Sequence, residues 1–224
     1  MVGRAALNIA NSNQTYFFKG DKYVKIHWTP GSTDEGISYG PTEFVKEWAS
    51  LKETGFTQID GILPIPGHDY RAYFFSGSKY ARIEYVPGAP GDKIIGAVRS
   101  ISDGWPSLAK AGFDRVDGAL LVPGKPDEAY IFSGEKYARI RFTEGSTNDE
   151  LLGGPKAITT GWSVIKFKSI DTIIPRPGTD NGAYIFSENK YVQLKVVVGG
   201  YDELVSDQRD VAPYWPSLKE AGFY

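Results

Sequence analysis

The segment AYIFSGEKYARIRF at residues 129–142 recurs almost unchanged as AYFFSGSKYARIEY at residues 72–85. A repeated match of this length indicates internal repeats, and the spacing of the copies indicates the architecture. A tyrosine in each copy recurs at intervals of 57, 57 and 54 residues, at Tyr16, Tyr73, Tyr130 and Tyr184. A later tryptophan recurs at intervals of 57, 57 and 53 residues, at Trp48, Trp105, Trp162 and Trp215. The 224-residue chain therefore contains four copies of one unit, at residues 1–56, 57–113, 114–166 and 167–224.

Each copy reads as three or four strands followed by a short helix. In the second copy, the apolar runs IDGILPI and AYFF predict two strands, the second of them buried on both faces. The turn SGSK supplies the glycine that a tight hairpin needs, and the alternating run YARIEY predicts a half-exposed strand after it. The segments WPSLAKAGF and WPSLKEAGF predict helices that begin at proline and end at glycine, whereas GWSVIKFKS in the third copy lacks both residues.

Four such units predict an all-β, four-bladed β-propeller in a single domain. One blade cannot bury its inner face alone, so neighbouring blades must cover one another. A solenoid would need polar end units, and no such sequence lies outside the four copies. No strand is exchanged between the two ends of the chain in this reading. We therefore expect the ring to close by packing of the fourth blade against the first.

Composition excludes several classes of function. The net charge is −2 and no basic run stands out, so nucleic acid and anionic membranes are not expected partners. The sequence shows no membrane-spanning run and no secretory signal. It contains no cysteine, which excludes disulfides, thiolate metal sites and cysteine nucleophiles and suits the cytosol. With two histidines and no phosphate-binding loop, the sequence predicts that the protein is not an enzyme.

The repeated pattern A-Y-[FI]-F-x-G-x-K-Y-[AV]-[RK]-[IL], followed by G-W-P-S-L, resembles the hemopexin repeat over essentially the whole chain. Four cysteine-free repeats most resemble the legume seed albumin-2 family, whereas animal relatives join blades 1 and 4 by a disulfide. The resemblance implies a non-enzymatic, ligand-binding seed albumin. It also implies calcium or sodium ions in an axial channel, binding of the polyamine spermine or of haem, and a homodimer. The alternatives are a protein–protein interaction scaffold and a seed nutrient reservoir.

The hemopexin pattern places a ring of backbone carbonyls at the residue that opens each repeat. In this chain the ring comprises Arg4, Asp60, Asp117 and Asp171, and a second ring two residues on comprises Ala6, Ile62, Ala119 and Ile173. Carbonyl oxygens are suitable ligands for hard cations. An arginine at the first position should lower cation affinity. The alternative is that the three aspartates cap turns where the chain enters each blade.

The sequence identifies no haem ligand. His27 lies in a predicted strand and His68 in a loop, and repeat symmetry does not pair them. For spermine, the aspartates supply carboxylates and the recurring tyrosines Tyr23, Tyr80, Tyr137 and Tyr191 supply aromatic faces. Because these tyrosines recur in every copy, core packing explains them equally well.

Overall fold

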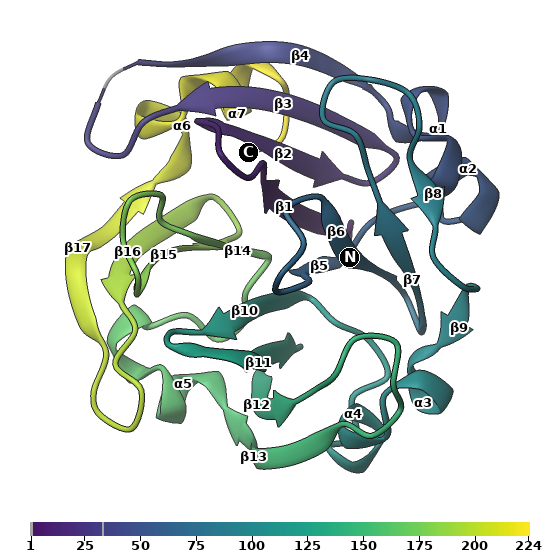
Figure 1. Ribbon diagram of the computed structural model, residues 1–224. Coiled ribbons are helices and arrows are strands. Elements are labelled where there is room, and N and C mark those ends of the chain that lie inside the picture. The colour runs from purple at the N-terminus through teal and green to yellow at the C-terminus, as the bar shows by residue number, and fades with distance from the viewer. Residues whose placement is uncertain (1, 33) are drawn as a thin grey trace.

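Each sequence copy forms one antiparallel sheet, with its strands in chain order from the centre of the ring outward (Figure 1). The computed structural model describes residues 2–32 and 34–224. Blade 1 contains β1 (Arg4–Asn8), β2 (Gln14–Lys19), β3 (Lys22–Trp28) and β4 (Glu35–Glu43). Blade 2 contains β5 (Gly61–Pro64), β6 (Arg71–Ser76), β7 (Lys79–Glu84) and an outer strand in two pieces, β8 (Lys93–Ile94) and β9 (Arg99–Ser100). Blade 3 contains β10 (Gly118–Val122), β11 (Lys125–Ser133), β12 (Lys136–Arg141) and β13 (Glu150–Ala157). Blade 4 contains β14 (Thr172–Pro175), β15 (Gly182–Ser187), β16 (Lys190–Lys195) and β17 (Glu203–Asp210).

The strand register is the same in every blade. The repeated tyrosine of the second strand pairs with the polar residue of the third strand, as Tyr16–Lys25, Tyr73–Arg82, Tyr130–Arg139 and Tyr184–Gln193. The second strand is buried on both faces in its centre, as residues 15–18 of β2 show. The four-bladed propeller predicted from the sequence is therefore confirmed.

The hydrophobic core lies between the blades rather than inside them. Four buried clusters join blades 1 and 2, 2 and 3, 3 and 4, and 4 and 1. Phe18 and Phe74 meet between blades 1 and 2 with ring centroids 6.0 Å apart, and Phe17 and Phe186 meet between blades 1 and 4 at 6.1 Å. The innermost strand β1 contacts both β5 and β14, so the ring is closed.

Each blade ends in two short helical segments, one on each side of the repeated tryptophan, rather than in one helix. These segments are α1 (Phe44–Glu47), α2 (Ala49–Thr54), α3 (Ile101–Gly104), α4 (Pro106–Lys110), α5 (Ile158–Gly161), the 3₁₀ helix η1 (Ser163–Ile165), α6 (Val211–Tyr214) and α7 (Pro216–Glu220). In blade 3, Lys166 adopts φ 57° after η1, whereas a glycine follows the corresponding helices elsewhere. Blade 3 lacks the proline and the glycine of the other copies in this segment, and its second helical segment is a 3₁₀ helix, which is wound more tightly than an α-helix. No helix among the described residues is long and apolar enough to cross a membrane.

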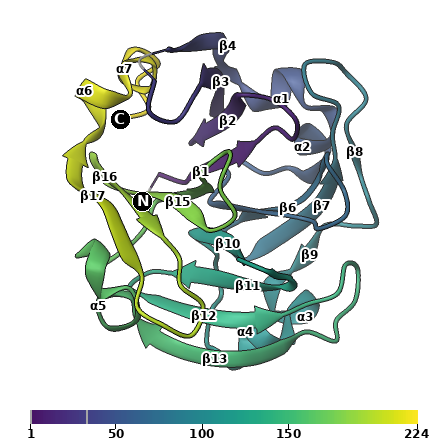
Figure 2. The same ribbon diagram turned by 60° about the vertical axis from the view of Figure 1, so that its left-hand side comes forward.

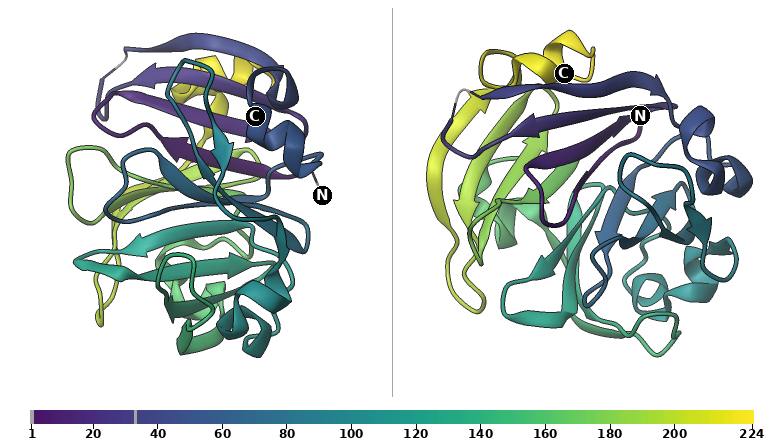
Figure 3. Two further views of the ribbon diagram at one scale, coloured as in Figure 1. Left: turned by 45° about the vertical axis from the view of Figure 1, so that its right-hand side comes forward. Right: turned by 45° about the horizontal axis from the view of Figure 1, so that its top comes forward.

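Carboxylates of one blade bind the helix start of the preceding blade. Asp92 accepts a hydrogen bond from the Ser50 backbone N–H at 2.6 Å, and Asp149 accepts one from the Ser107 backbone N–H at 2.7 Å. At the junction of blades 4 and 1, Glu35 at the start of β4 accepts from the hydroxyl of Ser217 in α7. Figure 3 shows α7 lying against β4, where this contact joins the two ends of the chain.

A second contact between the two ends of the chain comes from Arg4. Its Nη1 donates to Asp171 Oδ2 at 2.8 Å and to the Glu188 carbonyl at 3.0 Å, both in blade 4. Its guanidinium lies 4.5 Å from the ring centroid of Tyr224. The side chains of Arg4 and Asp171 are only 21% and 12% exposed, so water screens this ion pair incompletely. Figure 2 shows blade 4 between blades 3 and 1, with α6 and α7 beside the strands of blade 1. Ring closure therefore uses an ion pair as well as apolar packing.

We predict that Arg4→Met destabilises the protein by about 1–3 kcal/mol, because it leaves the half-buried Asp171 without its cation. The melting temperature should fall by about 3–10 °C for a domain of this size. Lys46→Met is the control, because Lys46 pairs with Glu43 inside blade 1 at 2.9 Å and both side chains are well exposed. Its cost should be at most about 1 kcal/mol. Equal melting temperatures for the two variants, measured by circular dichroism, would show that Arg4 does not help to close the ring.

Candidate functional site

The four residues predicted to form the first axial ring lie together at one end of the channel. Arg4, Asp60, Asp117 and Asp171 line a cavity of about 120 Å³, together with Gln58, Arg115 and neighbouring residues. We call this group of six residues the axial mouth. Each predicted residue begins or directly precedes an innermost strand, so the repeat brings the four positions to the same end of the ring.

The aspartates of the axial mouth also cap turns. Asp60 Oδ2 accepts a hydrogen bond from the Gly77 backbone N–H at 2.6 Å, and Asp117 Oδ2 accepts one from the Gly134 backbone N–H at 2.6 Å. Asp171 accepts in the same way from the Glu188 backbone N–H. The aspartates therefore cap the hairpin turn between the second and third strands of their own blade, rather than the turn at which the chain enters the blade. Blade 1 has no carboxylate at this position, and the Gly3 carbonyl there accepts from the Gly20 N–H at 2.9 Å.

The charges of the axial mouth do not balance. Arg4 pairs with Asp171, and Arg115 pairs with Asp117. Asp60 accepts a hydrogen bond from Gln58 Nε2 at 2.7 Å but has no cationic partner among the described residues. Burial is the largest effect on the pKa of Asp60 and raises it, and the nearby Asp117 adds to the rise. The Gly77 hydrogen bond, the charge of Arg115 and the Gln58 hydrogen bond lower this pKa by less than burial raises it. The axial mouth thus has room for one more positive charge, next to Asp60.

The second predicted ring provides no charged or polar side chain. Ala6, Ile62, Ala119 and Ile173 occupy equivalent positions in the register and are all buried. Over residues 2–32 and 34–224, no group of three or more His, Cys, Asp or Glu side chains is arranged to hold a metal ion. A resident calcium or sodium ion would therefore depend mainly on the backbone carbonyls of the predicted rings, with Asp60 supplying charge. Carbonyl oxygens with one carboxylate are the type of ligand that a hard cation takes.

We predict that Asp60→Asn stabilises the protein at neutral pH in sodium-free buffer with a chelator. The folded-state pKa of Asp60 is raised, so its contribution to stability is present below the unfolded pKa and is lost as pH rises through the folded value. Asparagine cannot ionise and can still accept from Gly77 through its single oxygen, but it gives up the hydrogen bond from Gln58 Nε2. The stabilisation should therefore be small at pH 7 and should disappear in acid. Calcium or sodium should raise the melting temperature less in the variant than in the wild type.

Thermal melts at pH 4 and pH 7, with and without each cation, measure both effects. Asp114→Asn is the control, because Asp114 is exposed and lies three residues from Asp117. An Asp60 variant that is less stable than the wild type at pH 7 would contradict the prediction.

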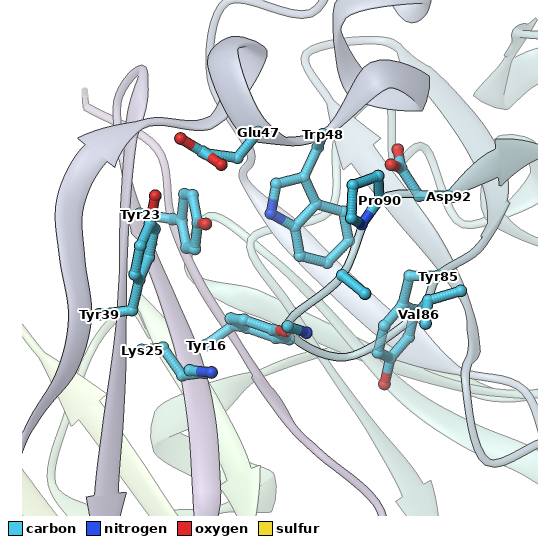
Figure 4. Close-up of a pocket in the computed structure, with 12 residues that line it drawn as sticks. Tyr16, Tyr23, Lys25, Tyr39, Glu47, Trp48, Tyr85, Val86, Pro90 and Asp92 are labelled. Carbon is cyan, nitrogen blue, oxygen red and sulfur yellow. The ribbon is translucent and has the colours of Figure 1, made fainter.

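A second candidate site is an aromatic pocket of about 180 Å³ between blades 1 and 2 (Figure 4). We call it the blade 1–2 pocket. Five aromatic side chains line it, namely Tyr16, Tyr23, Tyr39, Trp48 and Tyr85, together with Lys25, Glu47 and Asp92. The Tyr16 hydroxyl accepts a hydrogen bond from the Gly88 N–H at 3.2 Å, which fixes the ring across the junction of the blades.

Glu47 is the carboxylate in this pocket that faces the tyrosines (Figure 4). Its hydrogen bond with Tyr39 raises the pKa of that phenol. Burial raises the pKa of Tyr23, and the negative charge of Glu47 adds to that shift. Asp92 is already engaged by the Ala49 and Ser50 N–H groups. A carboxylate beside several aromatic faces is an arrangement that attracts organic cations.

Sequence reasoning missed this pocket because most of its residues recur in every blade. The predicted packing role of the recurring tyrosines is confirmed, since each lies on the tryptophan of its own blade with centroids 5.9–6.1 Å apart: Tyr23–Trp48, Tyr80–Trp105, Tyr137–Trp162 and Tyr191–Trp215. Two positions are particular to blade 1. Tyr39 is the residue of the outer strand that pairs with the third strand, and the equivalent residue of blade 3 is Gly153. Glu47 directly precedes the repeated tryptophan, and the equivalent residue of blades 2 and 3 is glycine. A comparison of the four copies at these two positions could have indicated the pocket.

The two histidines lie apart from both candidate sites. His27 Nδ1 lies 3.1 Å from the Ser38 hydroxyl, and His68 Nε2 lies 3.1 Å from Glu144 Oε2. The two imidazole rings belong to different blades, and neither lines the axial mouth or the blade 1–2 pocket. The residues at these two sites therefore do not fit axial ligation of haem iron by histidine.

A closed ring of four blades with this repeat and axial mouth defines a propeller of the hemopexin type. No family model matches the chain. Albumin-2 of Lathyrus sativus is 30% identical over 220 residues, which cover 96% of this chain and 95% of the relative. The chain belongs to the albumin-2 family of legume seed albumins.

Solved structures of seed proteins match the fold closely. The 2S albumin seed protein from Dolichos superposes with a TM-score of 0.87 at 32% identity, covering 98% of this chain and 99% of that one. The hemopexin fold protein CP4 from cow pea gives 0.85 at 30% identity, covering 96% of each chain. A plant lectin with two metal binding sites from Cicer arietinum gives 0.86 at 29% identity, covering 98% of this chain and 97% of that one.

Proposed function

We propose that this seed albumin is a non-enzymatic binding protein for an organic polycation such as spermine. The observation that carries the proposal is the blade 1–2 pocket, where Glu47 faces Tyr23 and Tyr39 beside Trp48 (Figure 4). An alkylammonium group in the pocket would lie against aromatic faces and pair with the carboxylate. Lys25 lines the same pocket, so the cation is expected to sit at the Glu47 side.

Inorganic cations are the second ligand of this proposal. Calcium or sodium in the axial channel would be held by the carbonyls at Arg4, Asp60, Asp117 and Asp171. The unpaired charge of Asp60 supports one such ion, whereas the guanidinium of Arg4 opposes high affinity. Two metal binding sites are named for the chickpea lectin, which also supports a cation here. Haem has no supporting residue geometry at the two sites and is not part of the proposal.

The absence of cysteine supports a cytosolic location for the protein. The alternatives to ligand binding are a protein–protein scaffold and a nutrient reservoir. Neither alternative explains why Tyr39 and Glu47 depart from the repeat at one pocket, and this departure favours ligand binding.

We predict that spermine gives a saturable isotherm with metal-free protein in isothermal titration calorimetry. Glu47→Gln and Tyr39→Leu should each weaken binding about two- to fivefold, since an exposed ion pair or cation–π contact is worth about 0.5–1 kcal/mol. Glu53→Gln is the control, because Glu53 is an exposed carboxylate on the nearby helix α2. Unchanged affinity in both pocket variants would place spermine elsewhere, and no saturable heat in the wild type would remove the proposal.

We also propose a homodimer formed through the outer strand of blade 4. Leu204 and Val205 of β17 are 39% and 45% exposed, and Tyr214 of α6 is 55% exposed. The outer edge of β17 is unpaired within the described chain, and unpaired edges favour association between sheets. Size-exclusion chromatography with light scattering should give twice the mass of one chain, and Val205→Lys should shift the population to monomer. A monomer mass for the wild type at high concentration would refute the dimer.

A further inference from the structure

The junction between neighbouring blades recurs four times, and two of the four junctions are filled by side chains. We call these junctions seams. At the seam of blades 2 and 3, Arg82 extends to Glu144 at 3.2 Å and occupies the space beside Gly145. At the seam of blades 4 and 1, Trp28 packs on Tyr184 and Trp215 with centroids 5.2 and 4.9 Å apart. The seam of blades 1 and 2 contains the pocket described above.

The fourth seam, between blades 3 and 4, contains a larger cavity of about 330 Å³. We call it the blade 3–4 cleft. Its walls are formed by Tyr130, Tyr137 and Trp162 of blade 3 and by a loop of blade 4 at residues 197–202. This cavity lies near the lower end of the range for small-molecule sites and would suit a single small ring.

Two sequence differences distinguish the seam of blades 3 and 4. The residue at the end of the third strand is aromatic at the other seams, as Tyr85, Phe142 and Trp28. In blade 4 it is Val196, which is buried in the core cluster of this seam and does not line the cleft. Gly153 stands where blade 1 has Tyr39, and a Cβ added at Gly153 would meet no atom within 4 Å. The wall of the cleft is therefore open at Gly153, where the blade 1–2 pocket has the Tyr39 side chain.

One tyrosine hydroxyl of the cleft lacks the backbone hydrogen bond that its equivalents make at the first two seams. At the first two seams the repeated tyrosine accepts a backbone N–H, from Gly88 to Tyr16 and from Gly145 to Tyr73. Within the described residues, the equivalent Tyr130 hydroxyl has no such hydrogen bond. Tyr130 packs edge-on against Trp162 with centroids 5.2 Å apart, so its ring position is retained while its hydroxyl is available.

Charged groups of both signs surround these rings. Asp202 accepts a hydrogen bond from the Val197 N–H at 2.9 Å, which holds its carboxylate in the loop of blade 4. Its charge adds to the effect of burial in raising the pKa of Tyr137, so the two groups are close. Arg139 lies 5.9 Å from the Tyr130 ring centroid and is already paired with Glu128. Lys156 lines the cleft and has no ion pair among the residues that the structure describes.

We propose that the blade 3–4 cleft binds a pyranose sugar. A pyranose has an apolar face that can lie on Tyr130 or Tyr137, and hydroxyls that can donate to Asp202 and accept from Lys156 and the tyrosines. A polycation would meet Lys156 and Arg139, and a strong anion would meet Asp202, so the mixed charges favour a neutral polyhydroxy ligand. The site is separate from the blade 1–2 pocket and does not depend on the proposed binding of spermine.

The test is saturation-transfer NMR and titration with the methyl glycosides of mannose, glucose, galactose and N-acetylglucosamine. At least one should bind saturably to the wild type. Gly153→Tyr, which rebuilds the residue of blade 1, and Asp202→Asn, which keeps the acceptor for Val197, should each weaken that binding at least tenfold. Gly153→Ala is the matched control for the first variant, because its methyl group has open space and should leave binding unchanged.

Spermine titration separates this proposal from the previous one. Gly153→Tyr should leave spermine affinity unchanged, and Tyr39→Gly should leave glycoside affinity unchanged, with melting temperatures confirming that each variant is folded. The sugar site is overturned if no glycoside binds saturably, or if Gly153→Tyr binds the glycoside as tightly as the wild type. Loss of spermine binding alone would affect only the blade 1–2 pocket.

Discussion

The fold depends on apolar packing shared between neighbouring blades. The buried second strand of each blade contributes one face to each of two clusters, as Phe17 and Phe18 do for blades 4 and 2. Burying an aromatic or aliphatic side chain of this size is worth about 1.5–3 kcal/mol. An isolated blade would expose both faces of that strand and lose these contributions. The four sheets are therefore stable only as a closed set, and the closed set creates the channel and the seams.

Shared packing also explains where the four copies can differ. The tyrosine and tryptophan of each repeat contact one another in every blade, so a change at either would disturb a core cluster. Positions at the outer part of a seam contact fewer buried groups and can vary. Tyr39, Glu47 and Gly153 are such positions. Specific binding properties in this repeat are expected at the seams, where neighbouring blades meet with unequal side chains.

Much of the fold was predictable from the sequence, because the period and the apolar alternation repeat four times. The four first-ring positions lie together at one end of the channel for the same reason, since a position fixed within one blade is fixed in all. The seam pockets were not predictable. Tyr39 of β4 pairs with Lys25 of β3, and the strand register shifts on both sides of this pair. The position and size of such a bulge cannot be inferred from the alternation of apolar and polar residues. The sequence also did not predict that Arg4 joins blade 1 to blade 4, because its partners Asp171 and Tyr224 lie at the other end of the chain.

The position of Arg4 links ring closure to the chemistry of the channel. Its guanidinium neutralises Asp171 at the axial mouth and holds blade 4 against blade 1 with the same contact. Arg115 pairs with Asp117, so among the described residues of the axial mouth Asp60 is the carboxylate without an ion pair. A cation bound at this mouth would compete with Arg4 for the carboxylate of Asp171 only if its charge were high. The residue that helps to close the ring without a disulfide therefore also places a positive charge at the axial mouth.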